Sequence, residues 1–274
     1  MALLVVIQLA QVSGARASDF WDSVRDPARG AHEQQLRKAQ AALASDAPRA
    51  ALAHAQAAIA RMPHLPAGYR LKGQALLALG QFGAASDAFA AALERDDSAL
   101  DAPDSTRTAH AAGVAAMRSG NYALAARVQQ RLAARLPPGE DRRRVFARLG
   151  DALMCMGPGQ LERATWAYTH ALSGAEPDDI DLYLGAALAT LRSGRRQDAM
   201  VALSQLRSAV RLEHALHNRI LPEAERLARL AVGLAAIGDQ RGAAEAWTLA
   251  AEQGGPWHAF HVRSAAELSH LERP

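Results

Sequence analysis

The chain has 274 residues, of which 50% are hydrophobic but only 5% are aromatic. Alanine and leucine, two strong helix formers, dominate the apolar share, so composition favours an all-helical fold. The 31 basic and 28 acidic residues are mixed along the chain, which argues against a nucleic-acid-binding protein, and a single cysteine, Cys155, excludes an internal disulfide and a four-cysteine metal site.

Residues 1–17 have the pattern of a secretory signal peptide. The run Met1–Ala10 is apolar but too short to span a bilayer as a mature helix, and Ala15-Arg16-Ala17 matches a small-x-small cleavage site. We therefore predict no stable membrane span and a periplasmic or secreted location. No basic residue precedes the apolar run, so the alternatives are a misassigned start codon or a packed helix, with a cytoplasmic location.

Residues 18–31 form a predicted N-terminal extension outside the repeated part of the chain. Phe20 and Trp21 give this segment its only aromatic side chains. We expect it to cap one end of the fold; a short docking segment is the alternative.

The repeat begins at about residue 32, and its clearest copy covers residues 69–93. The motif reads Tyr69-x-x-Lys72-Gly73-x-x-Leu76, then Gly80-Gln81-Phe82, then Ala85-x-x-x-Phe89-x-x-Ala92-Leu93. This pattern resembles that of the tetratricopeptide repeat (TPR) family. Further copies are marked by the residues Gly113, Ala125, Gly150, Ala164, Tyr168, Ala199, Ala243 and Trp247.

The spacing of one small residue gives the number of helix pairs. Ala51, Ala85, Ala125, Ala164, Ala199 and Ala243 follow one another at separations of 34, 40, 39, 35 and 44 residues. An alanine is required where the two helices of a pair cross, and the aromatic residue four positions later fills the gap to the next helix. We predict an all-α solenoid of about six helical hairpins over residues 32–252; the resemblance implies a right-handed superhelix.

Residues 253–274 are predicted to form a capping helix and tail. The last repeat of a solenoid exposes an apolar face, which Trp257, Phe260 and Leu268 would cover. Glycines 80, 120, 194 and 238 are expected to end first helices, where a left-handed conformation favours glycine.

The TPR resemblance implies that the first helix of each pair lines a concave, partner-binding groove. Carried onto this sequence, the groove residues with polar side chains are Arg70, Gln74, Arg107, His110, Arg118, Arg144, Arg148 and Asp151. Arginine pairs bidentately with carboxylates, so we expect a protein or peptide partner that is acidic or ends in a free C-terminal carboxylate. The alternative is that these arginines form an ordinary solvated helix face.

Two histidine pairs could bind a metal. His214 with His217, and His258 with His261, each lie at i and i+3 on a predicted helix. His258 and His261 flank the capping residues, which indicates surface packing. Met154-Cys155-Met156 contains soft ligands, but consecutive helical residues point in different directions, so we expect ordinary packing there. No cofactor is predicted.

The predicted function is a non-enzymatic adaptor or assembly scaffold, in a bacterial cell envelope, that holds a partner segment in the groove. No nucleophile elbow, phosphate-binding loop or acid–base constellation is present in the sequence. The alternatives are a self-associating structural solenoid, and a metal- or haem-binding helical protein or hydrolase that uses the histidine pairs. The pattern does not indicate an oligomeric state.

Overall fold

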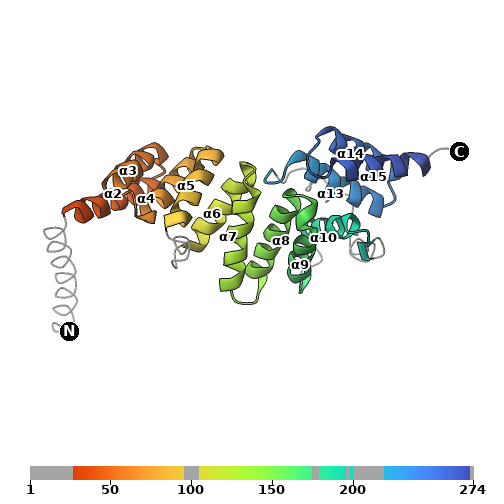
Figure 1. Cartoon of the computed structure of the whole chain (residues 1–274), viewed down its shortest axis with the longest axis horizontal. Coiled ribbons are helices and arrows are strands. Elements are labelled where there is room, and N and C mark those ends of the chain that lie inside the picture. Colours follow the sequence, from red (N-terminus) through yellow and green to blue (C-terminus); the bar gives the residue numbers. More distant parts are fainter. Residues whose placement is uncertain (1–26, 96–104, 175–178, 196–197, 200–218, 272–274) are drawn as a thin grey trace. The chain divides into compact units, whose positions relative to one another are not determined.

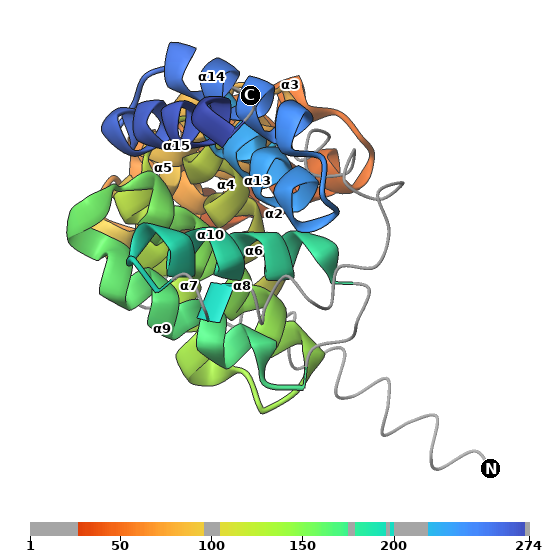
Figure 2. The same ribbon diagram turned by 90° about the vertical axis from the view of Figure 1, so that its right-hand side faces the viewer.

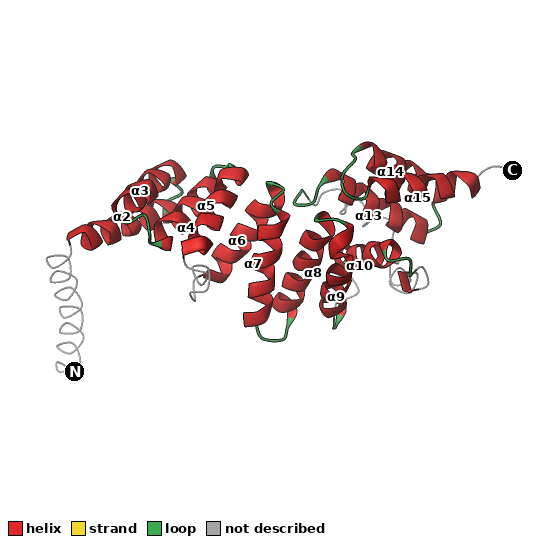
Figure 3. Ribbon diagram, viewed as in Figure 1, coloured by secondary structure: helices red, strands yellow, loops and turns green. Residues whose placement is uncertain are grey.

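The computed structural model describes residues 27–95, 105–174, 179–195, 198–199 and 219–271. The predicted signal peptide, most of the predicted extension, and the pair His214 and His217 lie outside these ranges. The described chain forms α-helices, one short 3-10 helix and loops, and contains no strand, as Figure 3 shows. The all-α prediction is confirmed. No described helix has the combination of length and hydropathy needed to cross a bilayer.

The chain divides into two compact units, residues 1–112 and 113–274. In unit 1, α2 packs on α3, α3 on α4, and α4 on α5 (Figure 1). The helices of this unit are α2 (Pro27–Ala44), α3 (Pro48–Arg61), α4 (Pro66–Ala78), α5 (Phe82–Arg95) and the first part of α6 (Ser105–Arg118). α2 begins inside the predicted 18–31 extension, so helical structure starts earlier than the repeat motif.

Unit 2 contains the end of α6 and the rest of the described helices. These are α7 (Tyr122–Arg135), α8 (Glu140–Cys155), η1 (Pro158–Gln160), α9 (Leu161–Leu172), α10 (Ile180–Arg192), α13 (Glu223–Ala236), α14 (Gln240–Glu252) and α15 (His258–Leu271). Neighbours in sequence again pack together, and α10 also packs on α13. Figure 2 shows α13, α14 and α15 lying together at the C-terminal end.

Glycine and a capping side chain make the turns between helices. Gly80, Gly120, Gly194 and Gly238 have positive φ angles of 72°, 78°, 81° and 89°, which confirms their predicted role. In two of these turns the next helix is capped by a side chain: Asn121 accepts a hydrogen bond from the Leu124 amide, and Asp239 accepts one from the Gly242 amide. A turn of this kind reverses the chain within a few residues and so produces a helical hairpin.

Small residues set the spacing of the helices. The six repeated alanines are fully buried, including Ala199. The repeat aromatics pack on glycines of the first helix of the same pair: a Cβ atom on Gly73 would lie 2.7 Å from the Phe89 ring, and one on Gly150 would lie 2.8 Å from the Tyr168 ring. Tyr168 also faces Gly185 of α10, which fits the predicted role of filling the gap to the next helix. In the α6–α7 pair, Gln129 takes the aromatic's place opposite Gly113.

The predicted C-terminal capping helix is α15, which packs on α14. Trp257 is buried, and Phe260 meets the ring of Trp247 edge-on at 5.7 Å between centroids. The expectation of surface packing holds for His258, which is exposed, but it is wrong for His261, whose side chain is completely buried. In the interior, Nε2 of His261 accepts a hydrogen bond from Arg192 of α10, which compensates for the loss of contact with water.

Candidate functional site

In unit 1, the predicted groove residues lie on α4 and α6. Arg70 and His110 are half-buried, and the side chain of Arg107 is outside the described residues. Gln74 donates a hydrogen bond of 2.6 Å from its Nε2 to the hydroxyl of Thr108. Because Thr108 is buried, this bond ties α4 to α6 and gives Gln74 a structural role.

In unit 2, the predicted arginines lie at the end of α6 and on α8. Arg118 and Arg144 are exposed, Arg148 is half-buried, and Arg144 forms an exposed ion pair with Glu140 one turn earlier. Arg144 and Arg148 are four residues apart on α8 and therefore share a face of that helix. The sequence around them is strongly basic. Residues 118–151 contain eight arginines and three acidic residues, whereas the whole chain has nearly equal numbers of basic and acidic residues.

Asp151, the last predicted groove residue, is held by groups from two other helices. It accepts a hydrogen bond of 2.6 Å from the Tyr168 hydroxyl and pairs with Arg229 of α13. Arg229 also donates to the Tyr168 oxygen at 3.0 Å and to the Asp181 carbonyl at 3.1 Å. Burial alone would lower the pKa of Arg229, but the Asp151 carboxylate outweighs burial and raises it, so this guanidinium stays charged.

A second buried ion pair lies between α10 and α13. Nη1 of Arg192 contacts both carboxylate oxygens of Glu225 at 2.9 Å, and Nη2 donates to Nε2 of His261 at 2.8 Å. The Arg192 guanidinium also lies 4.2 Å from the centroid of the Trp257 ring. Burial, followed by the charge of Arg192, lowers the pKa of His261 to about 4, so this imidazole is neutral near pH 7.

Three charged residues of these ion pairs were not predicted from the sequence: Arg192, Glu225 and Arg229. Glu225 and Arg229 are four residues apart on the buried face of α13, among apolar side chains such as Val232. A charged residue at an apolar helix position almost always has a partner, so this pattern was the available signal. The sequence did not reveal which residues would be those partners.

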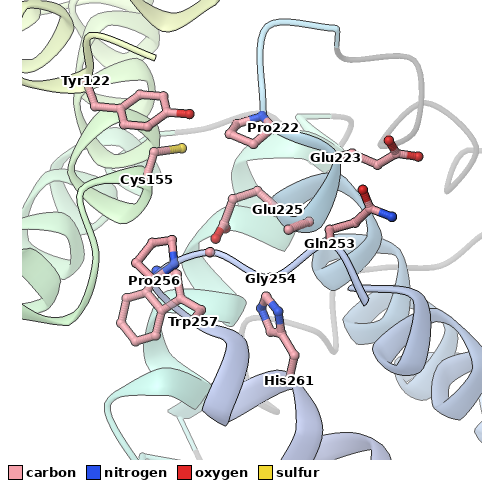
Figure 4. A pocket seen from close by; sticks show the side chains of 12 residues that line it. Tyr122, Cys155, Pro222, Glu223, Glu225, Gln253, Gly254, Pro256, Trp257 and His261 are labelled. Atoms are coloured by element: carbon pink, nitrogen blue, oxygen red, sulfur yellow. The ribbon is translucent and has the colours of Figure 1, made fainter. Parts of the chain in front are cut away.

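A cavity of about 220 Å³ adjoins the second ion pair, between the end of α8, the beginnings of α7 and α13, and the loop from α14 to α15. Figure 4 shows its lining side chains, which include Tyr122, Cys155, Pro222, Glu225 and Trp257. The Trp257 indole donates a hydrogen bond of 2.8 Å to the Met154 carbonyl and so fixes the loop to the end of α8.

Cys155 and His261 both line this cavity, a combination that in other proteins can form a nucleophile and its base. Here burial raises the pKa of the Cys155 thiol well above its ordinary value, and nearby Glu225 and Asp151 add to the increase. His261 already accepts a hydrogen bond from Arg192, and its lowered pKa makes it a weak base. The pair therefore lacks the features of an activated thiol.

The C-terminal histidine pair does not converge on one position. His261 is bound to Arg192, whereas Nδ1 of exposed His258 lies 2.9 Å from the Ala251 carbonyl. Met154 and Cys155 are buried while Met156 is 39% exposed, as expected for consecutive helical residues. The described ranges contain no group of three or more histidine, cysteine or acidic side chains able to hold a metal ion.

No protein-family model and no curated protein sequence matches this chain. Among solved structures, a double mutant of MamA from RS-1 is 19% identical, covers 64% of this chain and 92% of its own, and has a TM-score of 0.48. PilF of Pseudomonas aeruginosa is 13% identical, covers 90% of this chain and 100% of its own, with a TM-score of 0.45. YrrB, described as a TPR protein with an unusual peptide-binding site, is 18% identical over 77% of this chain and 96% of its own, with a TM-score of 0.41.

Proposed function

We propose that this protein is a non-enzymatic interaction scaffold that binds an acidic segment, or a free C-terminal carboxylate, of a partner protein. The observation that carries the proposal is the concentration of arginine in residues 118–151, with Arg144 and Arg148 on one face of α8. Glycine and alanine hold these helices at fixed spacing, so the guanidinium groups are presented by a rigid framework.

The chemistry of arginine matches a carboxylate partner. Each guanidinium can donate two parallel hydrogen bonds to one carboxylate. The ion pair between Arg144 and Glu140 is exposed, with both side chains 60% accessible, and such pairs stabilise a fold little. A partner carboxylate can therefore replace Glu140 at little cost to the scaffold.

The proposed place of action is the bacterial periplasm, or another compartment reached by export. This part of the proposal rests on the signal-peptide pattern of residues 1–17. Mass spectrometry of the protein from separated fractions of its own host tests it. An exported form that lacks these residues is expected, and an intact Met1 in the cytoplasmic fraction would contradict export.

The binding proposal is tested with a fluorescent acidic peptide that ends in a free carboxylate, titrated with the full chain. Replacing Arg144 and Arg148 by glutamate should weaken binding about tenfold or more, because two charge-assisted contacts become repulsive. Arg263→Glu on α15 is the matched control, since it makes the same charge change at an exposed arginine outside residues 118–151. Unchanged affinity in the double variant, or an equal loss in the control, would refute the proposal.

A further inference from the structure

The cavity beside Arg192 and Glu225 differs in charge from the arginine-rich helices of the same unit. Among the residues that the structure describes, no arginine or lysine lines it, and the two charged residues of the lining are both acidic, Glu223 and Glu225. Its volume, about 220 Å³, is below the range of about 300–1,000 Å³ common for drug-sized ligands. A single long side chain is therefore the class of ligand that its size suits.

The polar groups of the cavity are mostly hydrogen-bond acceptors. Glu223 is exposed at the rim, and Glu225 lies deeper with 6% of its side chain accessible. Both oxygens of Glu225 contact Arg192, but a carboxylate oxygen can accept more than one hydrogen bond. Within the described part of the chain, neither the Glu223 carboxylate nor the Tyr122 hydroxyl makes a hydrogen bond, so each can accept one from a ligand.

Of the described residues, Arg192 and His261 are the basic groups in contact with the lining, and neither can neutralise an incoming anion. The side chain of Arg192 is completely buried and already bonded to Glu225 and His261. His261 is neutral near pH 7, because burial and Arg192 lower its pKa to about 4. Within the described part of the chain, a carboxylate placed here would face Glu223 and Glu225 with no arginine or lysine in the lining, which disfavours it.

Much of the remaining wall is apolar. Pro222, Pro256 and Trp257 supply ring surfaces, and Trp257 is fixed by its hydrogen bond to the Met154 carbonyl. The aliphatic stem of a lysine or arginine packs well on such surfaces while its charged head reaches polar groups. The volume of the cavity, its hydrogen-bond acceptors and its apolar walls thus all favour a lysine or arginine side chain.

We propose that this cavity is an anchor site for one arginine or lysine side chain of a protein partner. The stem lies against Pro222, Pro256 and Trp257, and the cationic head bonds to Glu223, Glu225 and the Tyr122 hydroxyl. The inference rests on the proposed interaction function, but it uses a surface other than the arginines of α8. A partner that uses both surfaces would pair an acidic segment with a basic anchor residue.

The test uses a short peptide, blocked at both ends, with one central arginine between glycine and serine residues. Binding to the full chain is followed through the Trp257 indole N–H resonance in NMR spectra. The arginine peptide should shift this resonance and bind about tenfold more tightly than a peptide with neutral citrulline. Glu223→Gln should weaken the arginine peptide about three- to fivefold, because it removes one partly exposed charge. Glu252→Gln, an exposed glutamate outside the cavity lining, is the matched control.

Several outcomes would overturn the proposal. These are equal binding of the citrulline peptide or of a norleucine peptide, no shift of the Trp257 resonance at millimolar peptide, or equal effects of the two glutamine variants. A titration with free arginine amide is a further control. If it binds as tightly as the arginine peptide, the cavity recognises the amino acid itself and not a side chain of a protein partner. The acidic-peptide titration with the Arg144 and Arg148 variant is separate, so failure of either proposal is recognised on its own.

Discussion

The α4–α5 pair and the α8–α9 pair follow the same motif but use it differently. In each, an aromatic ring lies on a glycine of the first helix: Phe89 on Gly73, and Tyr168 on Gly150. The residue after the glycine then bonds to a later helix. Gln74 donates to Thr108, a bond between neutral groups, whereas Asp151 accepts from Tyr168 and pairs with Arg229.

This difference shows that a repeat position fixes geometry but not chemistry. The Tyr168 hydroxyl and the Asp151 carboxylate, together with the Asp181 carbonyl, hold the Arg229 guanidinium in the interior of unit 2. A buried ion pair adds little net stability over apolar packing, but removing one partner leaves the other charge buried and uncompensated. We therefore expect substitutions at equivalent positions of the two pairs to differ in effect.

The largest effect is expected for Arg229→Ala. It leaves the buried Tyr168 hydroxyl and the partly buried Asp151 carboxylate without their cation, which should lower the free energy of unfolding by about 3–5 kcal/mol. Urea denaturation followed by circular dichroism measures this change. Arg241→Ala is the control, because its ion pair with Glu245 is exposed and should contribute less than about 1 kcal/mol. A loss below about 1 kcal/mol for Arg229→Ala would show that the buried pair does not hold unit 2 together.

Glycine-to-alanine changes test the geometry that the two pairs share. A Cβ on Gly73 or Gly150 would lie within 2.9 Å of ring atoms of Phe89 or Tyr168, so each change should destabilise the protein by about 1–3 kcal/mol. Gly83→Ala on α5 is the matched control. Nothing lies within 4 Å of its added Cβ, so the higher helix propensity of alanine should stabilise by up to about 1 kcal/mol. Thermal and urea unfolding of the three variants give these values. A change in stability of the same sign in all three variants would contradict the close contact between the aromatic rings and the two glycines.

Tyr168→Phe turns the tyrosine of α9 into the residue found in α5. It keeps the ring on Gly150 but removes the hydroxyl that donates to Asp151 and accepts from Arg229. We expect a loss of about 1–2 kcal/mol in urea denaturation, less than for Arg229→Ala because the ion pair survives. A loss as large as that of Arg229→Ala would mean that the hydroxyl, and not the charge, organises the cluster.

Acid should lower the stability of unit 2 by protonating His261. Near pH 7 this loss of stability is absent, because the imidazole is neutral. The folded state holds the pKa of this residue at about 4, below the ordinary 6.5, so its stabilising contribution is complete above pH 6.5 and is lost as pH falls through about 4. Protonation removes the acceptor for Arg192 and places two cations side by side, with Glu225 as the facing anion and His258 nearby. The midpoint of thermal unfolding should fall more steeply between pH 6.5 and 4 in the parent chain than in His261→Gln, and parallel curves would contradict this assignment.

Much of the fold was predictable from sequence because its signals are local. Glycines in the left-handed region, alanines at the crossing positions and the aromatic four residues later are set by contacts within one hairpin. The copies at Gly73 and Gly150 are therefore read directly from spacing. The substitution of Gln129 for an aromatic residue opposite Gly113 was missed, because a glutamine in a helix usually indicates an exposed position.

The candidate sites were less predictable because they depend on distant residues. The arginines of α8 were identified from the repeat position, and their binding role stays a prediction. The cavity combines Tyr122 with residues about a hundred positions later, and no local pattern indicates that such segments meet. Asp151 likewise looked like a groove residue until Arg229, 78 residues away, was seen to bind it.

By itself, then, the sequence determined the helical class, the hairpin unit and the places where the chain turns, since these follow from backbone conformation and side-chain size within about forty residues. Tertiary structure decided which charges are buried and with which partners. Arg192, Glu225 and His261 come from three helices, and the pKa of His261 depends on the exclusion of water and on its distance from Arg192. Burial and pairing between distant residues arise only when the helices pack. The sequence alone therefore could not show that Glu223 and Glu225 line one cavity, whose charge is opposite to that of the arginine-rich face of α8.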